Sequence, residues 1–112
     1  MLTIFQWLRL GLMSLLMAVV LTGCSGTPVT EFEEARQALK RAVEENAPQF
    51  SQETYVRAMA AFSAATHEWH AQNARWSWER DYSTTIDLLV LATLDAHRAM
   101  EEAIQHQRLR QN

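Results

Sequence analysis

After residue 30 the chain is organised by apolar residues that recur every three or four positions, the spacing of one face of an α-helix. A first helix is expected to begin at Thr30, because Thr30 and Glu33 have the spacing of a capping box, in which each side chain accepts a free backbone N–H. It is expected to end near Asn46, since Pro48 disfavours helical geometry in the residue before it. Its apolar stripe consists of Phe32, Ala35, Leu39, Ala42 and Val43.

A second helix is expected to run from a cap at Ser51 to about Glu79, again with apolar residues at helical spacing. These residues should form its buried face: Tyr55, Ala58, Met59, Phe62, Ala65, Trp69 and Trp76. Trp78 falls on the other side of an ideal helix. Trp69 and Trp76 are therefore expected in the core. Trp78 is expected to contact a partner or lipid headgroups, and the alternative is that it packs into the turn toward the third helix.

A third helix is expected to begin after a cap at Asp81 or Ser83 and to continue to about Gln107. Residues 86–94 are apolar on nearly every side, so this stretch is expected to be the most buried part of the chain. Neither glycine nor proline marks the boundary between the second and third helices, so a kink that joins them remains an alternative to a loop.

Alanine follows the seams of all three helices with heptad-like spacing. The alanines are Ala35, Ala38 and Ala42, then Ala58, Ala61 and Ala65, then Ala92, Ala96, Ala99 and Ala103. The expected fold class is all-α. We expect an N-terminal signal helix followed by a small antiparallel bundle of three helices. The alternative is that the last two helices form a long hairpin. Alanine buries little apolar area, so we expect a thin core of modest stability.

The N-terminal segment has the order of a secretory signal peptide, with a positive charge at Arg9, then an apolar run over residues 10–21, then small residues. The run is short for a membrane-spanning helix, which needs about 20 apolar residues. Because residues 1–8 are also rather apolar, an uncleaved signal anchor remains the alternative.

Residues 21–24 read Leu-Thr-Gly-Cys and resemble the lipobox of bacterial prolipoproteins. This resemblance implies cleavage between Gly23 and Cys24 and attachment of lipid to Cys24, which would hold the protein on a membrane. Ser25 follows the cysteine, at a position where the sequence carries no aspartate. By resemblance to Gram-negative lipoproteins, this implies that the protein is sorted to the periplasmic face of the outer membrane rather than retained in the inner membrane. The chain would then divide into a signal peptide (1–23), a lipidated cysteine with a short tether (24–30) and a helical domain (31–112).

Composition narrows the function classes. The chain has 10 Lys and Arg against 13 Asp and Glu, and loss of Arg9 with the signal peptide leaves 9 against 13, a net charge of −4. Mild acidity disfavours nucleic acid as a partner, since nucleic-acid binding depends on clustered cations. Glycine occurs only at positions 11, 23 and 26, so phosphate loops and nucleophile elbows are not expected. We therefore expect neither an enzyme nor a cofactor.

His67 and His70 are the nearest approach to a metal motif, but their spacing is one residue short of HExxH. A third ligand would have to come from His97, His106 or a carboxylate on another helix. We therefore predict no metal site and keep the two histidines only as candidates. Trp78 is the candidate contact with a partner or with lipid headgroups.

Five stretches resemble a domain of unknown function found in small bacterial lipoproteins, alone or ahead of an OmpA-like peptidoglycan-binding domain. They are residues 34–39 (EARQAL), 47–48 (AP), 55–58 (YVRA), 81–82 (DY) and 92–99 (ATLDAHRA). The resemblance implies a cell-envelope association and no known catalytic residues. The function expected is a non-catalytic helical module that binds a protein partner or itself. The alternative is a lipoprotein that binds a small molecule or metal with its His67 and His70 face.

Overall fold

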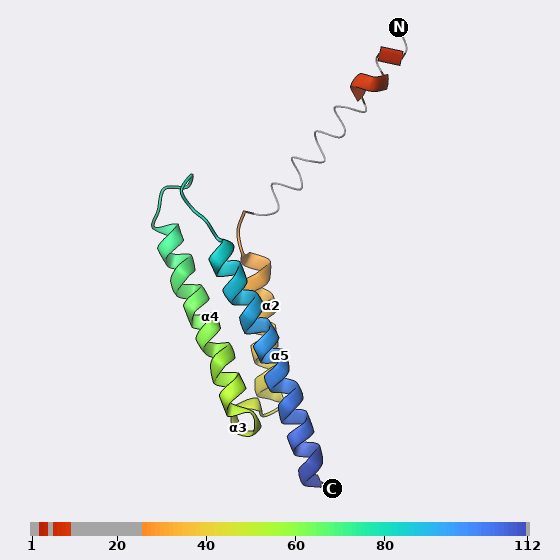
Figure 1. The fold of residues 1–112 in the computed structure, drawn as a ribbon, viewed down its shortest axis with the longest axis vertical. Helices are drawn as coiled ribbons and strands as arrows, with labels where there is room; N and C mark the ends of the chain where they lie inside the picture. Colours follow the sequence, from red (N-terminus) through yellow and green to blue (C-terminus); the bar gives the residue numbers. More distant parts are fainter. Residues whose placement is uncertain (1–2, 5, 10–25, 112) are drawn as a thin grey trace.

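The computed structural model describes residues 3–4, 6–9 and 26–111, and every regular element within residues 26–111 is a helix (Figure 1). The helices are α2 (Val29–Glu44), α3 (Ala47–Phe50), α4 (Gln52–Asn73) and α5 (Ser83–Gln111). The predicted all-α fold class is therefore confirmed. Residues 3–4 and 6–9 are also helical, whereas the rest of the predicted signal peptide, with Gly23 and Cys24, lies outside the described residues.

α2 begins at Val29, directly after Pro28, and no side chain caps it. The backbone carbonyl of Pro28 accepts the N–H of Phe32 at 3.0 Å. The predicted capping box of Thr30 and Glu33 is therefore wrong, because Thr30 already lies inside the helix. Proline suits the start of a helix, since it has no N–H to leave unpaired there and its ring restricts φ.

α3 is a short helix that the sequence analysis did not predict, and it turns the chain between α2 and α4. Asn46, just before it, has φ of 63°, a left-handed conformation that asparagine tolerates better than most residues. Pro48 lies in the first turn of α3, where a missing N–H leaves no hydrogen bond unmade. Ala47 is buried in one cluster with Ala99 and Ala103, so the corner packs against α5.

α4 ends at Asn73, six residues before the predicted end at Glu79. A loop over residues 74–82, which we call the Trp loop, then leads to α5. The kinked helix kept as an alternative is therefore wrong. α5 begins at Ser83, so Ser83 is its first residue rather than a cap before it, and the helix extends beyond the predicted end at Gln107 to Gln111.

α5 is the central helix of the body formed by residues 28–111, with α2 and α4 packed along it (Figure 1). α2 runs parallel to α5, because Phe32 near the start of α2 shares a buried cluster with Leu89, whereas Ala42 near its end lies with Ala103. α4 runs the opposite way, since Ala65 near its end packs with Leu89. We call residues 28–111 the helical body.

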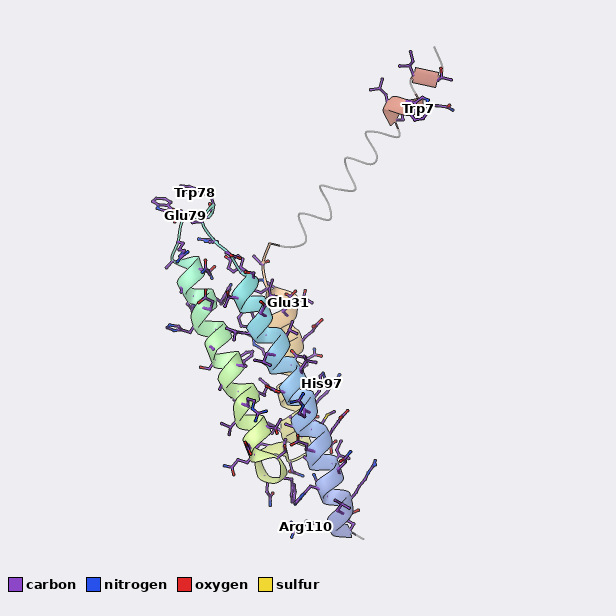
Figure 2. The ribbon with its side chains drawn as sticks, viewed as in Figure 1. Trp7, Glu31, Trp78, Glu79, His97 and Arg110 are labelled. Carbon is purple, nitrogen blue, oxygen red and sulfur yellow. The ribbon has the colours of Figure 1, made fainter. Side chains whose placement is uncertain are left out.

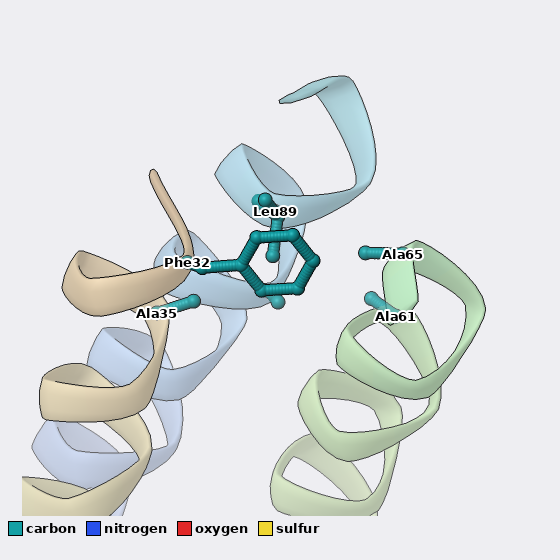
Figure 3. Packing of buried hydrophobic residues seen from close by; sticks show 6 residues of the cluster. Phe32, Ala35, Ala61, Ala65 and Leu89 are labelled. Carbon is teal, nitrogen blue, oxygen red and sulfur yellow. The ribbon is translucent and has the colours of Figure 1, made fainter. Parts of the chain in front are cut away.

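The core of the helical body is thin because it consists almost entirely of alanine. Of the 14 buried apolar residues in the described part of the chain, only Phe32, Leu39 and Leu89 are larger than alanine. Figure 3 shows the Phe32 ring reaching from α2 into the space between Leu89 of α5 and Ala65 of α4. Phe32 meets Phe62 edge-on at 5.9 Å between ring centroids, a favourable aromatic geometry. This one ring therefore fills the gap that small residues leave.

Several predicted burials are wrong. In residues 86–94, Leu89 and Ala92 are buried, whereas Val90, Leu91 and Leu94 are exposed. The reason is that α5 buries only the side that faces α2 and α4, so an apolar residue on its far side meets solvent. Exposure also overturns the burial predicted for three further residues: Val43, Met59 and Trp76. Within the described residues, no helix has the length and apolar character to cross a membrane.

Candidate functional site

The predicted lipidation site, Cys24, and the cleavage site before it lie outside the described residues, which resume at Gly26. Five peptide units separate Cys24 from Val29, the first residue of α2. An extended chain of that length spans at most about 18 Å. Whatever is attached to Cys24 therefore stays close to the end of the helical body where α2 begins.

The Trp loop lies at that same end. Figure 2 shows Trp78 and Glu79 beyond the point where α2 and α5 begin, with Arg110 at the opposite end. An open hollow of about 500 Å³ connects the loop to the N-terminal tether. It is lined by Gly26, Thr27, Ser77, Arg80, Asp81, Tyr82, Ser83 and Ile86. Residues 26–27 and the second half of the loop are therefore neighbours.

Hydrogen bonds to the end of α4 hold the loop in place. The side-chain oxygen of Gln72 accepts the Asp81 backbone N–H at 3.0 Å, and Oδ1 of Asn73 accepts the Tyr82 hydroxyl at 2.7 Å. The Arg80 guanidinium donates to the backbone carbonyls of Asn73 and Arg75 at 3.1 and 3.2 Å. The two bonds from Arg80 satisfy backbone carbonyls at and just beyond the end of α4, where a helix leaves such groups free. They also explain why α4 stops at Asn73.

Asp81, one of the two predicted caps, lies two residues before the first residue of α5 and contacts it. Its Oδ1 accepts the backbone N–H of Ser83 at 3.0 Å. This hydrogen bond from the Ser83 backbone lowers the pKa of the Asp81 carboxyl, and a second one from the Ser83 side chain acts in the same direction. The carboxylate thus stays charged beside the N-terminal end of α5, where the helix dipole favours an anion.

Trp76 and Trp78 form a stacked pair on the outside of the Trp loop. Their ring centroids are 5.2 Å apart and their planes differ by 10°. The two residues are 67% and 76% exposed. The core position predicted for Trp76 is therefore wrong, because α4 ends before reaching it. Trp78 is exposed rather than packed into the turn toward α5, which was the alternative for this residue.

The pair could have been found from a local pattern. In an α-helix, residues i and i+2 point in different directions, but in an extended or turning segment they lie on one side. Trp76 and Trp78 have that spacing, and Asn73 shortly before them is a residue type that often ends a helix. The helical spacing of Trp69 and Trp76 predicts a shared face of one helix instead. Of that pair only Trp69 is partly buried, with its ring centroid 5.3 Å from that of Phe32.

The two histidine candidates do not come together with a third ligand. His67 and His70 are both exposed on α4, and the His70 ring lies 5.3 Å from the Trp69 ring. Across the described part of the chain, no three His, Cys, Asp or Glu side chains are grouped closely enough to hold a metal ion. His106 lies near Phe50 at the other end of the helical body, with 5.5 Å between ring centroids.

Glu102 joins α5 to the start of α4. Its Oε2 accepts the Ser51 hydroxyl at 2.6 Å and the Thr54 hydroxyl at 2.9 Å. The bond from Ser51 is the main reason that the pKa of Glu102 is lowered, and the bond from Thr54 and the charges of Arg98 and Arg57 add to it against partial desolvation. The cluster fixes the end of the helical body that lies away from the tether.

A second polar group is buried between the helices. The Asp95 carboxylate lies in the interior of the helical body, with Oδ1 3.7 Å from the guanidinium of the more exposed Arg98. Its Oδ2 has no hydrogen-bond partner, and neither has Oγ1 of the buried Thr85. Unpaired buried polar atoms of this kind lower stability, so they further weaken a fold whose alanine core buries little apolar area.

Comparison of the chain with protein-family models, curated proteins and solved structures found no match.

Proposed function

We propose that the chain is a lipid-anchored protein of the bacterial cell envelope whose helical body binds a protein partner without catalysing a reaction. The observation that carries the proposal is the position of the only cysteine. Cys24 ends a lipobox-like tetrad after an apolar segment and stands five residues before α2. Acylation there would keep the helical body at the membrane surface. This proposal would also place the chain with the small alanine-rich lipoproteins that it resembles.

The proposed location is the periplasmic face of the outer membrane. The support for it is Ser25, the residue after the modified cysteine, by resemblance to Gram-negative lipoproteins that carry no aspartate there. Two or more acyl chains are enough for stable anchoring, whereas one binds only marginally. We propose that the three longer helices behave as one bundle behind this anchor.

An exposed apolar strip on α5 supports the binding half of the proposal. The strip consists of Val90, Leu91 and Leu94, which are about half exposed and lie on the side of α5 away from the core. Contiguous apolar residues on a protein surface are typical of interaction sites. The strip is therefore the docking surface that we propose.

A shallow hollow of about 110 Å³ lies beside the strip and indicates the chemistry of its partner. Its floor is apolar, with Leu89, Val90 and Leu94, and Glu31 and Glu34 of α2 stand at its rim. An amphipathic helix would fit here, with an apolar side chain in the hollow and Lys or Arg beside the two carboxylates. Such a partner would bury the strip and neutralise part of the acidic surface.

The anchor is tested by metabolic labelling with a radioactive fatty acid and by mass spectrometry of the processed protein. We expect cleavage before Cys24 and a lipid mass on that residue, and we expect Cys24→Ser to abolish both. Ser25→Asp is the matched control: it should keep the lipid but move the protein to the inner-membrane fraction. A processed and labelled Cys24→Ser protein would overturn the proposal.

The partner is tested by photo-crosslinking in cells from a reactive amino acid placed at position 91. We expect one specific crosslinked protein, lost when Leu94→Ser is added. Val56→Ser, at a similarly exposed apolar residue of α4, is the control and should leave the crosslink intact. A crosslink of twice the mass of the chain would identify a second copy as the occupant and overturn the proposed foreign helix.

A further inference from the structure

The stacked tryptophans of the Trp loop have no role in the proposed function, and they face outward at one end of the helical body. We propose that Trp76 and Trp78 insert into the headgroup region of the bilayer that holds Cys24. They would form a second membrane contact that sets the orientation of the helical body. This inference rests on the proposed lipidation of Cys24.

The Trp loop lies beside the segment of chain that leads to Cys24. Gly26 and Thr27 line the same hollow as Ser77 and Arg80, so the chain that comes from Cys24 passes beside the loop. Two peptide units separate Cys24 from Gly26, a span of at most about 7 Å. An acylated Cys24 would therefore draw the bilayer surface to this end of the helical body, and the pair would meet the lipid without any change of fold.

The chemistry of the two indole rings suits the interface between membrane and water. Indole has a large apolar body and one N–H donor, and tryptophan is enriched where membrane hydrocarbon meets water for this reason. Trp76 and Trp78 keep 67% and 76% of their surface exposed although they stack on each other. A stacked pair presents both rings as one apolar wedge, which suits a lipid interface better than two separate side chains.

Hydrogen bonds within the Trp loop and to the end of α4 hold the tryptophan pair in place. Trp76 accepts the Glu79 backbone N–H at its carbonyl at 2.9 Å, which closes a turn around Trp78. The Arg80 guanidinium donates to the Asn73 carbonyl and so ties the loop after Trp78 to the end of α4. The loop can thus enter an interface without first losing much conformational freedom, which lowers the entropy cost of binding.

The charges of the loop favour a neutral lipid surface over an anionic one. Arg75 and Arg80 are balanced by Glu79 and Asp81, and Arg80 is already engaged with backbone carbonyls. Glu31 on α2 adds a negative charge at the same end of the helical body (Figure 2). A membrane contact that depended on lipid phosphate would need a surplus of cations. We therefore expect insertion into zwitterionic membranes, with little effect of added salt.

The experiment uses the processed, lipidated protein reconstituted into phosphatidylcholine vesicles that carry brominated lipid. Bromine quenches tryptophan emission only at close range. We expect the wild-type emission to be blue-shifted and strongly quenched by lipid brominated near the headgroups. Trp76→Phe with Trp78→Phe should lose the quenched component and leave the emission of Trp69. Trp69→Phe is the matched control and should retain the quenched component.

Three results would separate the outcomes. Emission that bromine does not quench, or that aqueous iodide quenches freely in vesicles, would overturn the inference and leave the lipid anchor standing. Quenching that appears only with anionic lipid and vanishes in salt would overturn the proposed neutral insertion. Failure to find lipid on Cys24 would overturn the proposed function itself. Circular dichroism of each variant checks that the helices persist, and the double loop variant replaces no buried residue.

Discussion

The Tyr82 hydroxyl donates to Oδ1 of Asn73 over 2.7 Å, so the residue before α5 is tied to the last residue of α4. Gln72 takes part in the same way through the backbone of Asp81. Together these bonds turn the chain back at the Trp loop, and none of the residues from 74 to 82 has a positive φ. Side-chain hydrogen bonds thus replace the glycine that a tight helix–helix turn often uses.

Removal of this bond should loosen the loop. Tyr82→Phe keeps the ring and deletes only the hydroxyl, so we expect a loss of about 1 kcal/mol in the free energy of unfolding, the usual net value of one hydrogen bond. Urea denaturation followed by circular dichroism measures it. Tyr55→Phe, whose ring packs beside Leu39 and Ala58, is the control and should change stability less. Equal effects from both variants would contradict the assigned role.

Phe32 should be the most sensitive core position. Phe32→Ala empties the space between the three long helices, and the cost expected for such a truncation is about 3–5 kcal/mol. Because the remaining core is mostly alanine, we expect the variant to unfold near room temperature. Thermal denaturation checks this. Val29→Ala, at an exposed residue of the same helix, should change the stability by less than about 0.5 kcal/mol.

The alanine seam should resist enlargement. Ala96 is fully buried in one cluster with Leu39 and Ala58, where three helices meet. Ala96→Leu would force the helices apart, and overpacking of this kind costs about 1–3 kcal/mol. Ala71→Leu, at an exposed position of α4, is the matched control and should be close to neutral. Denaturant midpoints of the two variants give the comparison, and a stabilised Ala96→Leu protein would show that the seam is loosely packed.

Glu102 should make stability depend on pH. Hydrogen bonds, first of all from Ser51, lower the pKa of its carboxyl below the ordinary value of 4.5. A group with a depressed pKa in the folded state contributes stability above its unfolded pKa, and that contribution is lost as the pH falls through the folded pKa. We therefore expect the wild type to lose stability below about pH 4.5.

The matched pair for this test is Glu102→Gln and Glu101→Gln. The first should remove part of the acid-induced loss of stability, because its side chain no longer changes charge in this range. Glu101 is exposed, without the bonds that Glu102 makes, so its variant should follow the wild type. The effect is small because Glu102 is itself largely exposed. Unfolding curves at pH 7 and pH 4 give the comparison, and parallel behaviour of the two variants would contradict the assignment.

The three longer helices, α2, α4 and α5, could be predicted because their apolar periodicity and the effect of Pro48 are local properties of the chain, whereas α3 is too short to show a periodicity. The end of α4 could not, since it depends on bonds that Asn73 receives from Arg80 and Tyr82, which come later in the sequence. The same error moved Trp76 from the surface into the predicted core. Helical periodicity indicates which residues share a face of a helix, but it does not indicate at which residue the helix ends.

The burial of α5 shows a second limit. A stretch that is apolar all round predicts burial on every side, yet Leu91 and Leu94 are exposed because α2, α3 and α4 all pack against the other side of α5. The number of neighbours around a helix is a property of the whole fold. Of the predicted site residues, Trp78 is exposed, whereas Cys24 lies outside the described residues and its lipidation stays a prediction.

The length of α5 gives the proposed anchored protein a defined reach. Its 29 residues correspond to about 40 Å at 1.5 Å per residue. With Ser83 at the bilayer, the C-terminal turn and its Arg108 and Arg110 would stand several Debye lengths above the headgroups. Salt would then screen the charges of this cationic tip from the membrane that carries the protein. The tip would be held at a fixed distance from that membrane and would face structures deeper in the compartment.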